Sequence, residues 1–244
     1  MRTAVISDIH IDVNEQYPVL KELITYIKDN DVKVILVAGD ISSSCVQTQQ
    51  LMKQLEEQSD AKVWYVPGNH DLWHEDEERC SAEEIYQSFC ADPRCLSGKI
   101  IGVGNHVMIG DVAWFDYSFG NQRYSNEEFE QMPCNGRTWQ DSLFNDWSRD
   151  NQACCQRFLD NLEHLLQECR TRYPQKGIVF MTHMISDARY CVPEEIMNWS
   201  YYNAIRKGRH YAFQILIVSI NFLFSSSESR AMVLRTSLSR AVAV

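Results

Sequence analysis

Acidic, amide and imidazole side chains follow four separate apolar runs of this sequence. In chain order they are Asp8, His10, Asp40, Asn69, His70, Asp71 and His183. Carboxylate, amide and imidazole groups are hard or borderline metal ligands, and no thiolate stands among them, so the set suits Mn²⁺, Fe or Zn²⁺ better than a soft metal. A carboxylate between two such cations can bridge them, and the pair can lower the pKa of a shared water and clamp the oxygens of a phosphoryl group.

Each of these groups taken alone also has an ordinary structural explanation. Asp8 could cap the helix that follows it. Gly39-Asp40 and the segment 68–71 (GNHD) both resemble simple turns. The order of the groups, and the fact that each follows a strand-like run, favour one shared site over four unrelated turns.

The first third of the chain alternates between strand-like and helix-like segments. We expect strands at residues 3–7, 32–38 and 62–66, and helices at residues 17–30 and 47–58. Such alternation implies right-handed crossovers and a parallel sheet. In an open α/β sheet, sites assemble at the carboxyl ends of the strands, where these polar groups fall.

The remainder of the chain is less regular. We expect helices at residues 81–89 and 151–173, two strands within residues 100–118, and a strand at residues 177–182. Residues 121–147 have no clear period and could form a lid or a substrate-facing insertion. A set of aromatic residues could line a ring-binding wall, with core packing as the alternative. They are Trp114, Phe115, Tyr117, Trp139 and Trp147.

Composition excludes several classes of protein. The chain has 244 residues, 45% hydrophobic residues and a formal net charge of -10, which makes nucleic acid an unfavourable partner. The longest apolar run, residues 215–224, is about half the ~18 residues of a membrane span, and the N-terminus lacks the pattern of a secretory signal. The nine cysteines include no C-x-x-C pair, which indicates reduced thiols. We therefore expect a cytoplasmic protein that does not bind membranes.

The composition changes near residue 204. Residues 205–244 hold six basic residues and one acidic residue, a local charge of +5, which leaves -15 on residues 1–204. The same segment is rich in serine. We therefore divide the chain into a domain at 1–204 and an atypical tail at 205–244.

The four polar blocks resemble, in order, the first four motif blocks of the calcineurin-like metallophosphoesterases. The blocks are Asp8-x-His10, Gly39-Asp40, residues 68–71 and Thr182-His183. The sequence is most similar to small cytosolic phosphoesterases of Gram-positive bacteria, and segments 135–139 (NGRTW) and 199–204 (WSYYNA) have the character of that subgroup. The resemblance implies a four-layer α/β/β/α sandwich of two mixed sheets.

The resemblance also implies how the metal ligands are divided. Asp8 and His10 would bind a first metal, Asp40 would bridge both metals, and Asn69 and His183 would bind the second. Two divalent cations are implied, with Mn²⁺ as the first expectation and Fe or Zn²⁺ as alternatives.

Two further residues receive catalytic roles from the resemblance. His70 would face the scissile phosphate as a general acid or as a stabiliser of developing charge, and Asp71 would orient His70. The implied reaction is hydrolysis of a small phosphate mono- or diester by a hydroxide held between the metals, without a covalent enzyme intermediate.

The sequence departs from the family after His183. The family closes its site with a Gly-His-x-His block, but this chain has a single later histidine, His210. We interpret residues 205–244 as a frameshifted or otherwise replaced C-terminus, so that the last strands of one sheet would be missing and the fold marginally stable or prone to self-association.

Two rival functions follow from different classes of protein. The first is a non-catalytic binding or scaffold protein that keeps this fold without the final metal block. The second is a doubly wound nucleotide-binding module, which is disfavoured because residues 7–10 (SDIH) contain no glycine where backbone must approach a pyrophosphate.

Overall fold

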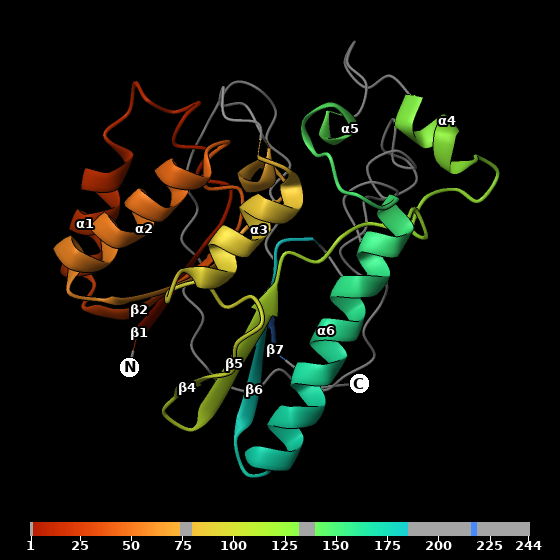
Figure 1. Cartoon of the computed structure of the whole chain (residues 1–244). Helices are drawn as coiled ribbons and strands as arrows, with labels where there is room; N and C mark the ends of the chain where they lie inside the picture. The colour runs from red at the N-terminus through yellow and green to blue at the C-terminus, as the bar shows by residue number, and fades with distance from the viewer. Residues whose placement is uncertain (1, 74–79, 132–139, 185–215, 219–244) are drawn as a thin grey trace.

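Two β-sheets pack face to face in the computed structural model, which describes residues 2–73, 80–131, 140–184 and 216–218 (Figure 1). The first sheet contains the parallel strands β1 (Arg2–Ile6), β2 (Val32–Ala38) and β3 (Lys62–Val66), in that order. The second contains β4 (Ile101–Val103), β5 (His106–Asp111), β6 (Gly177–Thr182) and β7 (Leu216–Val218). It is mixed, because β4 runs antiparallel to β5 whereas β5, β6 and β7 are parallel.

Helices cover the outer face of each sheet (Figure 1). On the first sheet these are α1 (Val19–Asp29) and α2 (Cys45–Ser59), and on the second it is α6 (Asn151–Arg172). A short 3₁₀ turn, η1 (His70–Leu72), and helix α3 (Ala82–Ala91) follow β3. The layers are helix, sheet, sheet, helix, which confirms the expected sandwich and excludes a single doubly wound sheet.

The alternation of side chains along β2 explains why its sequence is apolar throughout. Val34, Leu36 and Ala38 pack in the core between the two sheets. Ile35 and Val37 point the other way, into the core beneath the helices. Because successive side chains leave opposite faces of a strand, a strand covered on both sides needs apolar residues at every position.

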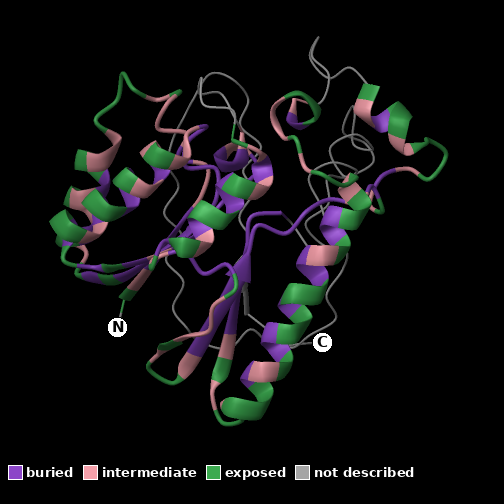
Figure 2. Cartoon of the chain, viewed as in Figure 1, coloured by how far each residue is buried: buried purple, intermediate pink, exposed green. Residues whose placement is uncertain are grey.

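Helix α6 confirms the stripe expected from its spacing. Its buried side includes Phe158, Leu162, Leu165, Leu166 and Cys169. Asp150 caps the N-terminus by accepting a hydrogen bond from the Ala153 N–H at 2.7 Å. Figure 2 shows the buried side of α6 turned toward the second sheet and the exposed side turned away from it.

The expected second strand of residues 100–118 is too long. Strand β5 ends at Asp111, and Trp114 and Phe115 lie beyond it. The chain leaves the extended conformation because Ala113 and Tyr117 have φ values of 58° and 64°, in the left-handed region. Trp114, Phe115 and Tyr117 are all buried in the core, so core packing is confirmed for these three aromatic residues.

The insertion at residues 121–147 contains two short helices, α4 (Asn126–Gln131) and α5 (Asp141–Phe144). Figure 1 places both near the N-terminal end of α6. Trp139 and the family-like segments 135–139 and 199–204 lie outside the described residues.

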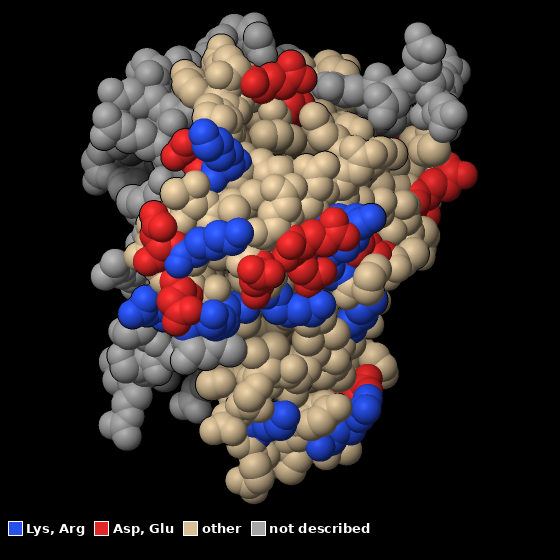
Figure 3. All heavy atoms as spheres, turned by 90° about the vertical axis from the view of Figure 1, so that its left-hand side faces the viewer, with Lys and Arg blue, Asp and Glu red and all other residues tan. Residues whose placement is uncertain are grey.

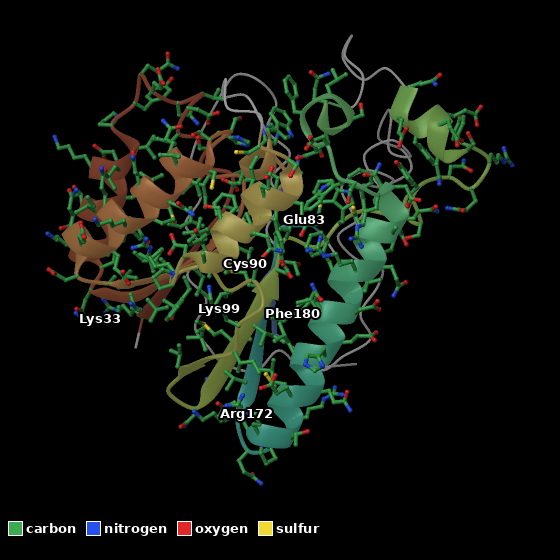
Figure 4. The ribbon with its side chains drawn as sticks, viewed as in Figure 1. Lys33, Glu83, Cys90, Lys99, Arg172 and Phe180 are labelled. Carbon is green, nitrogen blue, oxygen red and sulfur yellow. The ribbon has the colours of Figure 1, made fainter. Side chains whose placement is uncertain are left out.

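Polar contacts tie the layers together around α3. Glu83 on α3 forms an ion pair with Arg157 on α6, with Arg157 Nη2 donating to Glu83 Oε1 at 2.8 Å. Lys99 donates from Nζ to the backbone carbonyls of Cys90 and Asp92, each at 2.7 Å, which closes the loop after α3 (Figure 4).

Figure 3 shows basic and acidic side chains interspersed on the face that carries α1 and α2.

Part of the apolar run at residues 215–224 forms the edge of the second sheet. Strand β7 pairs in parallel with β6, with Val218 opposite Met181.

No described helix is long and apolar enough to cross a membrane. The described cysteines are all free thiols.

Candidate metal centre

The loops that follow β1 and β2 are joined by backbone hydrogen bonds beyond the ends of the strands. The Asp8 N–H donates to the Gly39 carbonyl at 3.0 Å, and the His10 N–H donates to the Asp40 carbonyl at 3.0 Å. This pairing holds the side chains of the two loops side by side. Helix α1 begins only at Val19, so Asp8 is not its cap and the alternative explanation for Asp8 is excluded.

Three successive candidate ligands have left-handed backbone conformations. The φ values are 53° for Asp8, 41° for His10 and 53° for Asp40. Aspartate and histidine are both enriched in this region relative to other non-glycine residues, but positive φ is uncommon for either. Strained backbone of this kind persists only where the surrounding structure enforces it, and it concentrates at functional sites.

Asp8, His10 and Asp40 form the first cluster of candidate ligands. One ligand atom from each lies within 4.8 Å of the others. His10 Nε2 is 3.7 Å from Asp40 Oδ2. The structure therefore brings together the residues that the sequence assigns to the first metal and to the bridge.

His183 and Asn69 form a second cluster on the other side of Asp40. His183 Nδ1 lies 2.8 Å from the Ala38 carbonyl and therefore carries the proton that it donates there. Its Nε2 lies 3.1 Å from Asn69 Oδ1 and 3.3 Å from Asp40 Oδ1. In the neutral tautomer of His183 that is protonated at Nδ1, the lone pairs of His183 Nε2, Asn69 Oδ1 and Asp40 Oδ1 converge with no proton between them. A cation at this point would bind all three. The residues present fit a divalent metal.

The pKa values of the buried groups are set by burial and by the charges of their neighbours in the two clusters. Burial would lower the pKa of His183, but the charge of Asp40 and their hydrogen bond raise it to about 10. Burial would raise the pKa of Asp40, but the imidazoles of His183 and His70 hold it well below its usual range. For Asp8, burial dominates and raises the pKa to about 6. A proton on His183 does here what a cation would do, because it neutralises converging acceptors.

Two glycines allow the loops to approach closely. A Cβ at Gly68 would lie 2.1 Å from Asp40 Oδ1 and 2.4 Å from the Asp40 nitrogen. A Cβ at Gly39 would lie 2.7 Å from the ring of His183, and Gly39 has a φ of 81°. Any side chain at either position would push the ligand loops apart.

His70 lies beside both clusters. Its backbone N–H donates to Asp40 Oδ1 at 3.1 Å. Its ring meets the ring of His10 edge-on, with centroids 4.8 Å apart, and stacks on Trp73 with centroids 3.7 Å apart. His70 is partly exposed, so its imidazole can reach a bound substrate.

Asp71 holds the ligand loops together. Its carboxylate is fully buried and accepts hydrogen bonds from the backbone N–H groups of Gly68 at 2.7 Å and Ser42 at 3.0 Å. The Thr48 hydroxyl also donates to it, at 2.7 Å. Burial and the nearby Asp40 raise the pKa of Asp71 to about 6. These contacts fix the β3–η1 loop against the β2–α2 loop, while the expectation that Asp71 orients His70 stays a prediction.

Asp141 and Trp73 border the second cluster but were not predicted from the sequence. Asp141, in α5, accepts a hydrogen bond from Asn69 Nδ2 at 3.0 Å and one from Trp73 Nε1 at 2.5 Å. Asp141 lies in the insertion without clear period, far along the chain from Asn69, so no spacing could have revealed the contact. His210 lies outside the described residues.

The chain is similar to several solved structures, of which the first has the same fold. A phosphopantetheinyl hydrolase from Mycobacterium tuberculosis is 14% identical, with a TM-score of 0.62 over 85% of this chain and 77% of that one. A protein from Thermus thermophilus is 11% identical, with a TM-score of 0.46 over 86% of this chain and 73% of that one. A dimetal phosphatase from Danio rerio is 12% identical, with a TM-score of 0.40 over 82% and 75% of the two chains.

A comparison with curated proteins gives no significant match. The family model for calcineurin-like phosphoesterases matches residues 1–206, which include every candidate ligand. The chain belongs to the calcineurin-like phosphoesterase family.

Proposed function

We propose that this protein is a metal-dependent phosphoesterase that hydrolyses phosphate mono- or diesters at a two-cation centre. The observation that carries the proposal is the position of Asp40. Its Oδ2 lies 3.7 Å from His10 Nε2 in the first cluster, and its Oδ1 lies 3.3 Å from His183 Nε2 in the second. One carboxylate therefore offers an oxygen to each cluster, as a bridging carboxylate can.

The donor set suggests how two cations would be held. Asp8 and His10 would bind the first, Asn69 and His183 the second, and Asp40 both. The oxygen and nitrogen donors suit Mn²⁺, with Fe or Zn²⁺ as alternatives. When bound, such a pair supplies Lewis-acid polarisation of water and of phosphoryl oxygens.

The chain's own residues would then orient a small phosphate ester and manage its charge. The imidazole of His70 borders the clusters and is partly exposed, so it is placed to donate a proton to the leaving oxygen or to stabilise developing charge. Asp71 fixes the loop that carries His70 through its bonds to backbone N–H groups. The free thiols of the described cysteines support a reducing, cytoplasmic location for this activity.

A second function keeps the fold but not the catalysis. The sequence lacks a Gly-His-x-His block after His183, so a binding or scaffold protein with an incomplete metal shell is the alternative. The same gap underlies the proposal that residues 205–244 replace the family's C-terminus. Translation of the gene in its other two reading frames tests that proposal, and absence of the block from both frames would count against it.

Metal content and hydrolysis of simple esters test the two functions together. The purified chain is loaded with Mn²⁺, its bound metal is counted by elemental analysis, and p-nitrophenyl phosphate and bis-p-nitrophenyl phosphate are offered with and without a chelator. Two metals per chain with chelator-sensitive hydrolysis support the phosphoesterase. Zero or one metal without hydrolysis supports the scaffold protein, and hydrolysis that a chelator does not affect contradicts both.

Variants of the two clusters show whether the metals occupy separate sites. His10→Ala removes a ligand only from the first cluster, and His183→Ala removes one only from the second. Each variant is expected to bind one Mn²⁺ per chain tightly, and the double variant to bind none. Loss of both metals from either single variant would show that the clusters form a single site.

A further inference from the structure

Helix α5 places a buried carboxylate against the second cluster. Asp141 is 3% exposed, and its Oδ1 accepts hydrogen bonds from Asn69 Nδ2 and Trp73 Nε1. Its Oδ2 is buried without a hydrogen-bond partner among the described residues. A buried carboxylate in the insertion is costly, so its retention there calls for an explanation.

The bond to Asn69 determines which way that amide points. A carboxylate accepts hydrogen bonds, and the amide of asparagine has one donor end and one acceptor end. Asp141 therefore holds the NH₂ end of Asn69 on its own side. The Oδ1 end is left facing His183 Nε2, 3.1 Å away, where a metal ligand is needed.

The bond to Trp73 determines where the His70 ring lies. The indole of Trp73 stacks on His70 with centroids 3.7 Å apart and an interplanar angle of 29°. Phe144, also in α5, stacks on Trp73 with centroids 4.8 Å apart. Helix α5 thus holds the indole through Asp141 and through Phe144, and the indole supports the imidazole.

We infer that Asp141 is a positioning residue that orients Asn69 toward the second cation and, through Trp73, fixes the imidazole of His70. The inference rests on the proposed function, because it assigns the insertion a part in that reaction. Asp141 itself touches neither substrate nor the reacting atoms in this assignment. It acts through two neighbours: Asn69, which faces the second cation, and Trp73, which supports the ring of His70.

Asp141→Ala is the main test, with Asp146→Ala as the matched control. Asp146 lies in the same segment, but its Oδ1 accepts from the Ala82 N–H at 2.7 Å, at the start of α3, and not from Asn69 or Trp73. Loss of a residue that orients a ligand typically costs about 10- to 100-fold in metal affinity or activity. For Asp141→Ala we expect the weaker of two Mn²⁺ affinities, measured by calorimetric titration, to fall by about that factor, and kcat to fall similarly with KM changed less than about threefold.

A second readout does not depend on metal or turnover. Because the Trp73 ring stacks on His70, we expect its ring current to shift the NMR signal of His70 Hε1 upfield, and a His70→Gln sample assigns that signal. We expect Asp141→Ala to move it downfield in the metal-free protein, and Asp146→Ala to leave it in place. Asp141→Asn, which keeps an acceptor oxygen, should lie nearer to the wild type in all three measurements.

The outcomes separate this inference from the proposed function. If the wild type binds two Mn²⁺ and hydrolyses bis-p-nitrophenyl phosphate while a folded Asp141→Ala does both equally well, the positioning role alone is overturned. If the wild type does neither, both proposals fall. Should Asp141→Ala not fold, Trp73→Phe keeps an aromatic ring beside His70 and removes the indole N–H that bonds to Asp141. An unchanged kcat in that variant overturns the role assigned to Trp73, and a reduced kcat supports it.

Discussion

Asp40 and Asp111 both lie at the carboxyl end of a strand, one in each sheet, yet their surroundings differ. Asp40 follows β2 in the middle of the first sheet, and Asp111 is the last residue of β5 inside the second sheet. Both are buried. Asp111 accepts hydrogen bonds from the Tyr86 hydroxyl at 2.9 Å and from the Val112 N–H at 2.9 Å. Asp40 instead faces two imidazoles, His10 and His183.

The difference shows that a carboxylate at the end of a strand becomes a ligand only when its neighbours are ligands too. Protein donors satisfy Asp111, although burial still raises its pKa to about 6. Imidazole nitrogens surround Asp40 and hold its pKa below the usual range despite burial. The predictions below test this contrast between a structural acid and a metal-binding acid.

Removal of the Asp40 carboxylate should have the largest effect. Asp40→Ala takes a ligand from both clusters, and the loss of a two-metal clamp removes several kcal/mol of transition-state stabilisation, or about a thousandfold in rate. Steady-state hydrolysis of bis-p-nitrophenyl phosphate with saturating Mn²⁺ measures the loss. Asp160→Ala, at an exposed position on α6, should keep full activity. An Asp40→Ala variant with activity within tenfold of the wild type would contradict the bridging role.

A methyl group added at Gly68 should displace the Asp40 carboxylate. Gly68→Ala places a Cβ 2.1 Å from Asp40 Oδ1, and overpacking of this kind costs about 3 kcal/mol of stability. We expect a lower midpoint in urea unfolding and weaker Mn²⁺ binding. At Gly102 the nearest atom to a Cβ is Lys176 Nζ, 3.7 Å away, so Gly102→Ala is the matched control and should leave both properties near the wild type. Equal effects of the two variants would show that steric contact with Asp40 is not the cause.

Much of the fold could be predicted because its strands have distinctive local sequences. Strands β2, β3 and β6 have the predicted bounds, since each is a run of apolar residues that ends at a glycine, a proline or a polar residue. The first cluster could also be predicted, because Asp8 and Asp40 each follow a strand of a parallel sheet. Parallel neighbours bring their carboxyl ends to one edge, so chain order alone implied proximity.

The missed features depend on contacts between distant segments. Strand β5 ends at Asp111 because Ala113 and Tyr117 adopt left-handed conformations, and neither residue type signals that conformation in a sequence. Asp141 meets Asn69 only because the insertion folds back over η1. The bonds of Asp71 to the backbone of Ser42 and Gly68 likewise require two loops to be in place. Sequence spacing predicts strand ends but not these contacts.

Asp111→Asn should have the smallest effect on the metal centre, because it should change stability without changing metal binding. The folded-state pKa of Asp111 is raised from 3.8 to about 6, so folding favours its protonated form and stability falls as pH rises through this interval. A shift of about two units corresponds to about 3 kcal/mol at most. Asparagine cannot ionise, so the free energy of unfolding of Asp111→Asn relative to the wild type should rise by up to that amount between pH 4 and pH 7. Urea unfolding at several pH values measures the difference, and the exposed Asp160→Asn should show no such trend. If the relative stability of Asp111→Asn does not change with pH while its Mn²⁺ affinity falls, then Asp111 belongs with Asp40 among the metal-binding acids, and the contrast between the two strand ends fails.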